Sequence, residues 1–279
     1  MDLAKKNELM KTACKVRMGV IEATFRAKSG HPGGSLSISD LLTYLYFSEM
    51  NVDVKNPQWE DRDRLVLSKG HTAPGLYSVL AQKGYFPEEE LKGLRQVGRL
   101  LQGHPDMKTI PGVDMSSGSL GQGISVACGM ALSAKISNKD YRVFTILGDG
   151  EIEEGMVWEA AMFAGHYKLN NLVAIVDNNG LQIDGKLSEV CSPEPIDAKF
   201  AAFNWRVLLL DDAHDFDKIE QVFNEAKTPC DKPTVIIQKS VKGKGVSFME
   251  NSAAWHGTAP NAEQYEQAMS ELKAAYAAL

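Results

Sequence analysis

Residues 148–155 read GDGEIEEG and residues 172–185 read LVAIVDNNGLQIDG, and these two stretches decide the fold of the chain. Just before the first stretch, Arg142–Leu147 is mostly β-branched or apolar and ends at a glycine turn, which predicts a buried parallel strand. Leu172–Val176 repeats this pattern, and Met156–Tyr167 between the two strands has helical character. We therefore expect a βαβ unit.

Polar residues follow both predicted strands directly. Asp149 comes after the first strand, and Asp177, Asn178 and Asn179 come after the second. Ligands of open parallel sheets bind beyond the carboxyl ends of the strands, so these side chains are expected to face one site. Carboxylate, amide and carbonyl oxygens suit octahedral Mg²⁺, which keeps its other positions for water and phosphate oxygens. The pattern favours a diphosphate site, although Gly-Asp-Gly alone often marks only a turn.

Composition limits the possible functions. The chain has 279 residues, of which 44% are hydrophobic and 24% charged, as is typical of a soluble globular enzyme. Its net charge of −6 argues against nucleic acid or an anionic membrane as the main partner. The four cysteines form no Cys-x-x-Cys pair, so neither a zinc site nor a disulfide framework is predicted. No stretch resembles a signal peptide or a membrane span, so we expect a soluble, cytoplasmic protein.

The N-terminal part predicts helices around a glycine-rich loop. Apolar residues at helical spacing cover residues 3–27 and stop at Ser29–Gly34. That loop is either a helix stop with a turn or a segment that presses its backbone and His31 against a ligand. Ile38–Phe47 is a buried helix candidate, and Arg64–Ser68 reads as a short strand.

Further along, Ser117–Gly123 is a second glycine-rich loop, and it opens a helix that runs to Ile136. Free amides at such a helix start can hold an anion or cofactor, and close helix packing is the alternative. The remaining predicted elements are a helix at Gly75–Lys83, strands at Trp205–Leu210 and Thr234–Lys239, a helix at Phe216–Ala226 with Asp215 as its N-cap, and a helix at Asn261–Ala278. We expect one doubly wound α/β domain over residues 1–279.

Five of the six histidines are next to a glycine in the sequence: His31, His71, His104, His166 and His256. Glycine lets a substrate approach the backbone, so several loop histidines indicate a polar pocket that handles protons. His166 is an exception, because it ends a helix and can interact with the last carbonyls. His214 precedes a helix and is expected at the surface.

The chain resembles the N-terminal half of transketolase over roughly residues 10–260. The matching stretches are Ser29–Gly33, Leu67–His71, Gly103–Pro105, Ser117–Gly123, Gly148–Gly155, Asp177–Gly185 and Trp255–Gly257. The order and spacing of the histidine motifs around the metal motif carry the resemblance. It implies the thiamine diphosphate-binding fold, an α/β fold with a mainly parallel sheet flanked by helices on both faces.

The resemblance also implies thiamine diphosphate as the cofactor, with Mg²⁺, Ca²⁺ or Mn²⁺. Asp149 and Asn179 match the metal's side-chain ligands, and Leu181 matches the residue that gives its carbonyl. The positions that match catalytic residues are His31, His71, His104 and His256. The positions that match cofactor-binding residues are His71, Gly118, Ser119, Leu120, Gly148, Asp149, Gly150, Glu154, Asn179, Leu181, Lys244 and His256. Glu154 and Glu159 resemble a carboxylate network at an interface between subunits, or they merely favour the helix dipole.

The implied reaction transfers a two-carbon ketol unit from a ketose or ketose phosphate to an aldose or aldose phosphate, as in pentose phosphate metabolism. The family's pyrimidine-binding domain has no counterpart in these 279 residues. We therefore expect a heterotetramer with a C-terminal transketolase subunit that carries this domain. The alternatives are a non-catalytic cofactor-binding module, the α subunit of a 2-oxo acid dehydrogenase, and a subunit similar to deoxyxylulose phosphate synthase. The histidine loops favour a sugar substrate over an acyl substrate.

Overall fold

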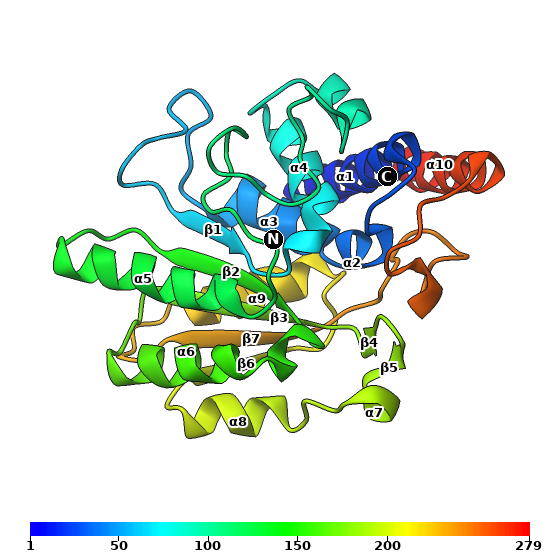
Figure 1. The fold of residues 1–279 in the computed structure, drawn as a ribbon. Helices are drawn as coiled ribbons and strands as arrows, with labels where there is room; N and C mark the ends of the chain where they lie inside the picture. The colour runs from blue at the N-terminus through cyan, green and yellow to red at the C-terminus, as the bar shows by residue number, and fades with distance from the viewer.

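A sheet of five parallel strands forms the central layer of the computed structural model, which describes residues 1–279 (Figure 1). The strands lie in the order β1-β2-β3-β7-β6, and every neighbouring pair is parallel. Their bounds are β1 Arg64–Leu67, β2 Val143–Gly148, β3 Leu172–Asn178, β6 Arg206–Leu210 and β7 Thr234–Lys239. The near-continuous apolar runs produce this arrangement because strands of a parallel sheet are buried on both faces.

Helices cover both faces of the sheet, as the resemblance predicts (Figure 1). Phe144 and Ile146 of β2 point to one face, which is packed by α1 (Leu3–Ala27), α3 (Ser39–Tyr44), α4 (Ala73–Lys83) and α9 (Phe216–Ala226). Val143 and Leu147 point to the other face, which is packed by α5 (Gln122–Ile136), α6 (Gly155–His166) and α8 (Ile196–Ala202). Successive strand side chains thus feed two separate cores. The predicted fold class is confirmed.

The chain reverses direction across the sheet after β6. It passes from β2 through α6 to β3, and then through α8 to the edge strand β6. From there α9 leads back to β7, which lies between β3 and β6. Since parallel crossovers are right-handed, a reversed step places its helix on the opposite face of the sheet. This explains why α9 packs opposite α6 and α8.

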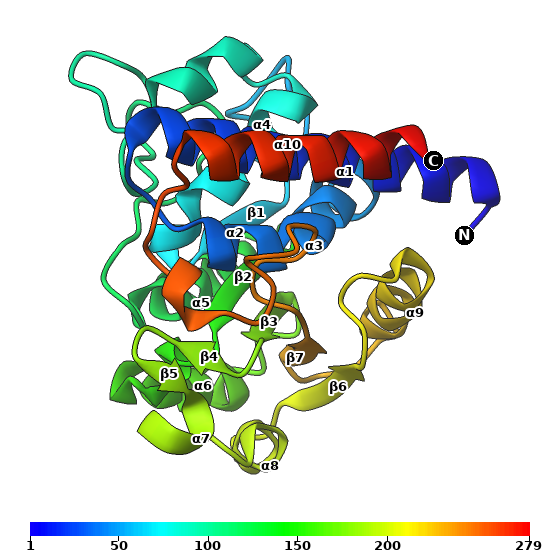
Figure 2. The same ribbon diagram turned by 90° about the vertical axis from the view of Figure 1, so that its right-hand side faces the viewer.

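The long helices begin and end close to the predicted positions. The N-cap of α9 is Asp215, whose Oδ1 accepts a hydrogen bond from the Asp217 amide at 3.0 Å. The last helix, α10 (Ala262–Ala277), begins after Asn261, and it lies along α1 (Figure 2). The rings of Phe25 and Tyr265 stack between these two helices, with their centroids 4.2 Å apart.

Three segments differ from the sequence predictions. The Ser29–Gly34 stretch is not wholly a loop, because Pro32 begins a short helix, α2 (Pro32–Ser37); the fixed φ of proline suits a first helical turn. The predicted helix at Ile38–Phe47 is α3 followed by a π-helical turn at Leu45–Glu49. The segment after β3 forms a hairpin and a helical turn too short for a periodic signal: β4 (Leu181–Gln182), β5 (Gly185–Lys186) and α7 (Leu187–Val190).

The remaining regular segments are 3₁₀ turns at Gly70–Thr72, Glu88–Gly93, Glu151–Glu153 and Ala253–Trp255. The carboxyl ends of the central strands lie in register, because Gly148 is paired with Asp177 and Asp177 with Gln238. The loops that leave these strands therefore meet at one edge of the sheet. None of the helices has the length and apolar character needed to cross a membrane.

Gly123 allows α5 to pack closely against the end of β1. A Cβ added at Gly123 would lie 2.6 Å from the Cα of Ser68, whereas one at Gly129 of the same helix would meet nothing within 4 Å. We expect Gly123→Ala to lower the free energy of unfolding by about 1–3 kcal/mol, the usual cost of overpacking. Gly129→Ala is the matched control, and it should raise this free energy by up to about 1 kcal/mol because alanine favours helices. Urea unfolding of both variants tests the pair, and equal stabilities would contradict the tight contact.

Candidate active site

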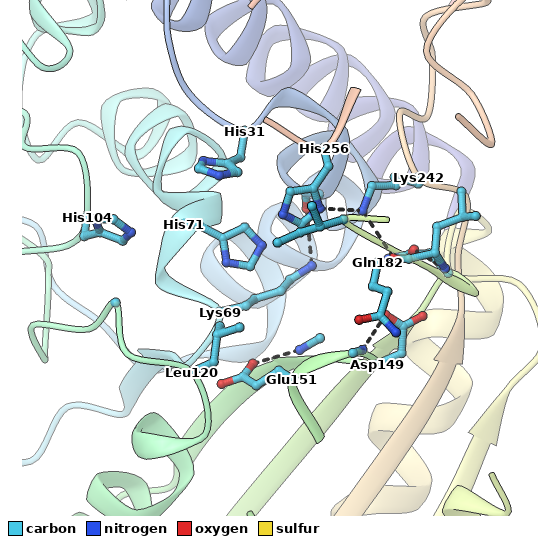
Figure 3. Close-up of a pocket in the computed structure, with 17 residues that line it drawn as sticks. His31, Lys69, His71, His104, Leu120, Asp149, Glu151, Gln182, Lys242 and His256 are labelled. Atoms are coloured by element: carbon cyan, nitrogen blue, oxygen red, sulfur yellow. Dashed lines mark hydrogen bonds between the residues drawn. The ribbon is translucent and has the colours of Figure 1, made fainter. Parts of the chain in front are cut away.

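A cavity of about 270 Å³ opens at the carboxyl ends of the central strands, and 17 residues line it (Figure 3). Pockets for small ligands usually measure about 300–1,000 Å³, so this cavity lies near the lower end of that range. The predicted site residues that line it are His31, His71, His104, Gly118, Leu120, Gly148, Asp149, Gly150, Asn179, Leu181 and His256.

Three predicted site residues do not line the cavity. Ser119 lies on the glycine-rich loop Ser117–Gly123, which we call the cradle loop. Its Oγ accepts a hydrogen bond from Gln122 Nε2 at 3.2 Å. Glu154 is the exposed residue that precedes α6. The Nζ of Lys244 lies 3.5 Å from the carboxylate of Glu250, outside the cavity. Lys242, two residues earlier, enters the cavity instead, because the loop turns at the glycine between the two lysines.

Other lining residues were not assigned to the site from the sequence: Gly34, Lys69, Glu151, Gln182, Ile183 and Lys242. Lys69 and Glu151 lie inside motifs that the sequence analysis singled out. Because they are close in sequence to His71 and Asp149, their place in these motifs could have predicted that they line the cavity. Gln182 follows Leu181 in the β4–β5 hairpin, and its amide nitrogen donates to Glu153 at 3.1 Å.

Asp149 lies in the turn after β2 and is only 3% exposed. Its carboxylate accepts hydrogen bonds from the amides of Gly150 at 3.0 Å and Gly180 at 2.6 Å. Burial, together with the nearby charge of Asp177, raises the pKa of Asp149 to about 6. A cation beside this carboxylate would reverse that shift, because an opposite charge favours the ionised form.

Two further oxygens belong to residues that line the same cavity as Asp149. The side-chain oxygen of Asn179 accepts from the Leu181 amide at 3.1 Å, and the Leu181 carbonyl accepts from Lys242 Nζ at 3.3 Å. Each of these oxygens keeps a free lone pair. The chain contains no cluster of three His, Cys, Asp or Glu side chains arranged for a metal. The set consists instead of one carboxylate, one amide and one carbonyl, a hard donor set that fits Mg²⁺.

Asp177 is completely buried at the end of β3 and does not line the cavity, unlike the neighbouring Asn179. Its carboxylate accepts from Lys69 Nζ at 2.5 Å and from the hydroxyls of Ser37 at 2.6 Å and Ser240 at 2.5 Å. Burial opposes ionisation, but Lys69 and the hydroxyl donors hold the pKa of Asp177 well below its usual range. The expectation that Asp177 faces the ligand is therefore wrong, because its charge is used within the protein.

Glu151 joins three loops of the site. Its carboxylate accepts from the hydroxyl of Ser68 at 2.5 Å and from the amides of Gly121 and Gly148, each at 2.9 Å. These donors follow β1, precede α5 and end β2, respectively. One buried side chain thus fixes the cradle loop of Gly118 and Leu120 relative to the turn that carries Asp149.

Three imidazoles contact one another on the opposite side of the cavity (Figure 3). Their ring centroids are 5.0 Å apart for His31 and His71, 5.4 Å for His31 and His256, and 5.2 Å for His71 and His256. Burial is the main cause that lowers their pKa values, to about 4 for His31, 2 for His71 and 3 for His256. All three are therefore neutral at pH 7 and can both donate and accept hydrogen bonds.

The histidine side of the cavity has one polar atom without a partner in the protein. The Nδ1 of His31 is buried and has no hydrogen-bond partner. His104 lies apart from the three imidazoles and packs beside Gly118, where a Cβ would lie 3.2 Å from its ring (Figure 3). Since buried polar atoms are normally paired, a hydroxyl-bearing ligand would satisfy His31.

Lys242 gives the cavity its positive side. Its Nζ lies 3.1 Å from His256 Nδ1 and 3.3 Å from the Leu181 carbonyl. Burial, and then the charge of Lys69, lowers the pKa of Lys242 to about 8, so most of it remains charged at pH 7. An ammonium group beside three hard oxygens suits an anion that is also bound to a metal ion.

His214 is not a surface residue, contrary to the prediction. Its side chain is 11% exposed and lies between Asp40 of α3 and the loop after β7. The sequence signal was misleading because the residue before a helix N-cap is usually solvated, whereas here the helix begins against the core. His166, in contrast, is exposed at the end of α6.

Comparison with known proteins identifies the class of this site. Residues 9–276 match the family described as "Transketolase, thiamine diphosphate binding domain". The chain therefore belongs to the transketolase family, as its resemblance predicted.

Two relatives of similar length are transketolase subunits by name. The chain is 45% identical to a 6-deoxy-6-sulfo-D-fructose transketolase subunit, SqwG, of Clostridium sp. (strain MSTE9), covering 95% of this chain and 96% of the relative. It is 43% identical to one named subunit of the apulose-4-phosphate transketolase of Phocaeicola vulgatus, covering 92% and 91%. The crystal structure of transketolase from Campylobacter jejuni superposes with a TM-score of 0.90 at 33% identity, covering 98% of this chain and 43% of that one. The chain thus has nearly the full length of the two subunits.

The low pKa of His71 predicts a pH-dependent stability. The ordinary pKa of histidine is 6.5, and the pKa of His71 in the folded chain is about 2. Between these two pH values the unfolded chain therefore binds a proton at His71 and the folded chain does not. The stability that this group contributes is present above pH 6.5 and is lost as the pH falls towards 2. We expect Tm to fall between pH 7 and pH 4, and to fall less in His71→Asn.

The matched control is His166→Asn, which changes an exposed imidazole and should leave the slope of Tm against pH unchanged. Thermal unfolding followed by circular dichroism measures both variants. A slope in His71→Asn equal to that of the wild type would show that this imidazole is not excluded from water.

Proposed function

We propose that this chain is the thiamine diphosphate-binding subunit of a two-component transketolase. The observation that carries the proposal is a cavity that combines three hard oxygens, one ammonium group and a cluster of neutral imidazoles at a sheet edge. Residues 1–279 act as one diphosphate-binding domain. The two relatives that are named as subunits, which this chain matches over more than nine-tenths of their length, support the same arrangement.

The residues present fit a metal-bound diphosphate. Asp149, Asn179 and the Leu181 carbonyl would hold Mg²⁺, and Ca²⁺ or Mn²⁺ could take its place on the same ligands. Lys242 would pair with the diphosphate, since its ammonium already lies 3.3 Å from the Leu181 carbonyl. Gly118 and Leu120 form the part of the wall that would contact the rest of the cofactor.

When bound, thiamine diphosphate supplies the electron sink for cleavage of the carbon–carbon bond next to a ketose carbonyl. The chain's own residues orient the sugar and move its protons. Neutral His31 and His256 would contact substrate hydroxyls, and the negative charge of a bound diphosphate beside Lys242 would raise their low pKa values towards the range that suits proton transfer. His71 and His104 line the same cavity and provide hydroxyl contacts. The substrates would be ketose and aldose sugars or their phosphates, including those of the pentose phosphate type.

A second chain with a pyrimidine-binding domain would complete the site. Helix α6 and the residue after it present apolar side chains to solvent, with exposed fractions of 57% for Met162, 37% for Phe163 and 47% for Tyr167. Glu154 and Glu159 are exposed at the start of the same helix. We assign this surface to contacts between the chains of a cytoplasmic heterotetramer with two copies of each, because a contiguous apolar face marks an interaction site.

Lys242 and Lys244 form a matched pair for testing the cofactor site. Loss of the charged hydrogen bond in Lys242→Ala should raise the Kd of thiamine diphosphate roughly 10- to 100-fold, because bonds to charged groups contribute about 1.5–3 kcal/mol. Lys244→Ala should change the Kd less than about twofold, since this ammonium lies outside the cavity. Calorimetry at fixed Mg²⁺ measures both variants. A larger loss in Lys244→Ala would return the diphosphate contact to the residue first predicted.

The proposed two-component arrangement predicts activity that depends on a partner. The purified chain should bind thiamine diphosphate weakly with Mg²⁺ and give no product in a coupled ketose–aldose assay. Adding the pyrimidine-domain chain should restore turnover, and light scattering should give the mass of two copies of each chain. Asp149→Ala serves as the control with the partner present, because it removes the charged ligand and should abolish turnover. Robust turnover by the chain alone would refute the two-component proposal.

A further inference from the structure

Lys242 lies on a loop whose course is not set by regular structure. The loop Ser240–Gly245 follows β7, and its two glycines have positive φ angles, 79° at Gly243 and 92° at Gly245. Such a segment can take several paths unless other parts of the chain fix it. One fixed point is the amide of Gly243, which donates to the Gly33 carbonyl at 2.9 Å.

His214 fixes the residue immediately before Lys242. Its Nε2 lies 3.0 Å from the amide nitrogen of Val241, and its Nδ1 lies 2.7 Å from Oδ2 of Asp40. Because Nε2 accepts a hydrogen bond from an amide, it carries no proton, and Nδ1 carries the proton that is donated to Asp40. Both side chains are almost buried, at 11% and 6% exposure.

Arg17 fixes the other end of the loop and anchors Asp40 as well. Its Nε donates to the Lys244 carbonyl at 3.1 Å, and its Nη1 donates to Asp40 Oδ1 at 3.0 Å. Its Nη2 donates to the other oxygen of Asp40, so the pair is bidentate. Arg17, Asp40 and His214 therefore hold the backbone on both sides of Lys242, although none of the three lines the cavity.

A buried charged network of this kind needs an explanation beyond stability. The desolvation cost of a buried ion pair often equals or exceeds its Coulombic gain, so apolar side chains would hold the same elements together as well. Apolar side chains cannot, however, accept a hydrogen bond from the Val241 amide or donate one to the Lys244 carbonyl. Together with the Gly243–Gly33 bond and the bond from the Asn251 amide to the Lys242 carbonyl, these two bonds hold the backbone that carries the ammonium group of Lys242.

We propose that His214, oriented by Asp40 and Arg17, is a positioning residue for Lys242. His214 accepts a hydrogen bond from the Val241 amide, and in this way it fixes how far the ammonium group of Lys242 extends into the cavity. The inference rests on the proposed function, in which this ammonium group pairs with the diphosphate. A misplaced ammonium group would weaken this contact, because charge-assisted hydrogen bonds depend on short distances.

Two variants separate this role from a merely structural one. In His214→Gln, the longer side chain brings an amide oxygen to the place of Nε2, so the Val241 amide keeps its acceptor. In His214→Asn, the shorter side chain can still donate to Asp40, but it leaves the Val241 amide unpaired. We expect His214→Asn to raise the Kd of thiamine diphosphate roughly tenfold, because the freed loop no longer holds Lys242 in place and part of its charged contact with the anion is lost. His214→Gln should stay within about threefold of the wild type.

The measurement is calorimetric titration of thiamine diphosphate at fixed Mg²⁺ into the complex with the pyrimidine-domain chain. In steady state, His214→Asn should raise KM for the cofactor, and kcat should be close to that of the wild type at saturating cofactor, because the bound anion then holds Lys242 in place. In a Lys242→Ala background, the substitution His214→Asn should add no further loss of affinity, because a double-mutant cycle detects a shared route of action.

Several results would overturn the inference. These are a wild-type Kd in His214→Asn, a raised Kd in His214→Gln, or the same tenfold loss in the Lys242→Ala background. If His214→Asn does not fold, the Kd of His214→Gln decides, since only a value near the wild type supports the proposal. Failure of the wild-type complex to bind thiamine diphosphate would instead refute the proposed function itself.

Discussion

The buried ion pair between Lys69 and Asp177 is the interaction on which the rest of the site depends. It joins the segment after β1 to the end of β3, and the same carboxylate also accepts from Ser37 of α2 and Ser240 after β7. One side chain thus holds four segments that are distant in the sequence. Such a network is stable only when every donor is present, and removing one partner of a buried pair typically costs about 3–5 kcal/mol. The end of β3, the segment after β1, helix α2 and the segment after β7 are therefore held as one unit.

This ion pair also determines which charges remain for a ligand. Three carboxylates lie close together at the strand ends, and two of them are engaged within the protein, Asp177 by the charge of Lys69 and Glu151 by three uncharged hydrogen-bond donors. Asp149 has only two amide donors, fewer than Glu151, although burial raises the pKa of both carboxyls. On the cationic side, the charge of Lys69 is used by Asp177, which leaves Lys242. One carboxylate for a cation and one ammonium for an anion remain, which is the charge pattern of a metal diphosphate.

The sequence predicts the parts of this site that depend on local rules. Apolar runs that end at glycines locate the strands. Because parallel strands end at the same edge of the sheet, Asp149 and Asn179 are brought to that edge whatever the conformation of the loops. The histidines next to glycines converge for the same reason, and His31, His71 and His256 are in contact. What the sequence does not predict is the direction in which a side chain points from an irregular loop. Lys242 and Lys244 share the neighbour Gly243, and only the turn at that glycine separates them. His214 has no local signal of burial, because its partners, Asp40 and Val241, are far from it in the sequence.

The same positive charges that favour a diphosphate also control the histidines. Lys242 lies 3.1 Å from His256, and its charge adds to burial in lowering the pKa of that imidazole. A second charge, on Lys69, acts in the same direction on His71. An anion bound at Lys242 would offset part of this field and raise the pKa of His256, while a metal ion on Asp149 would limit the rise. The basicity of the imidazole nearest the cation is thus linked to occupancy of the diphosphate site. Placing Lys242 correctly therefore affects both the affinity for the anion and the proton chemistry beside it, which is why the loop that carries it is fixed on both sides.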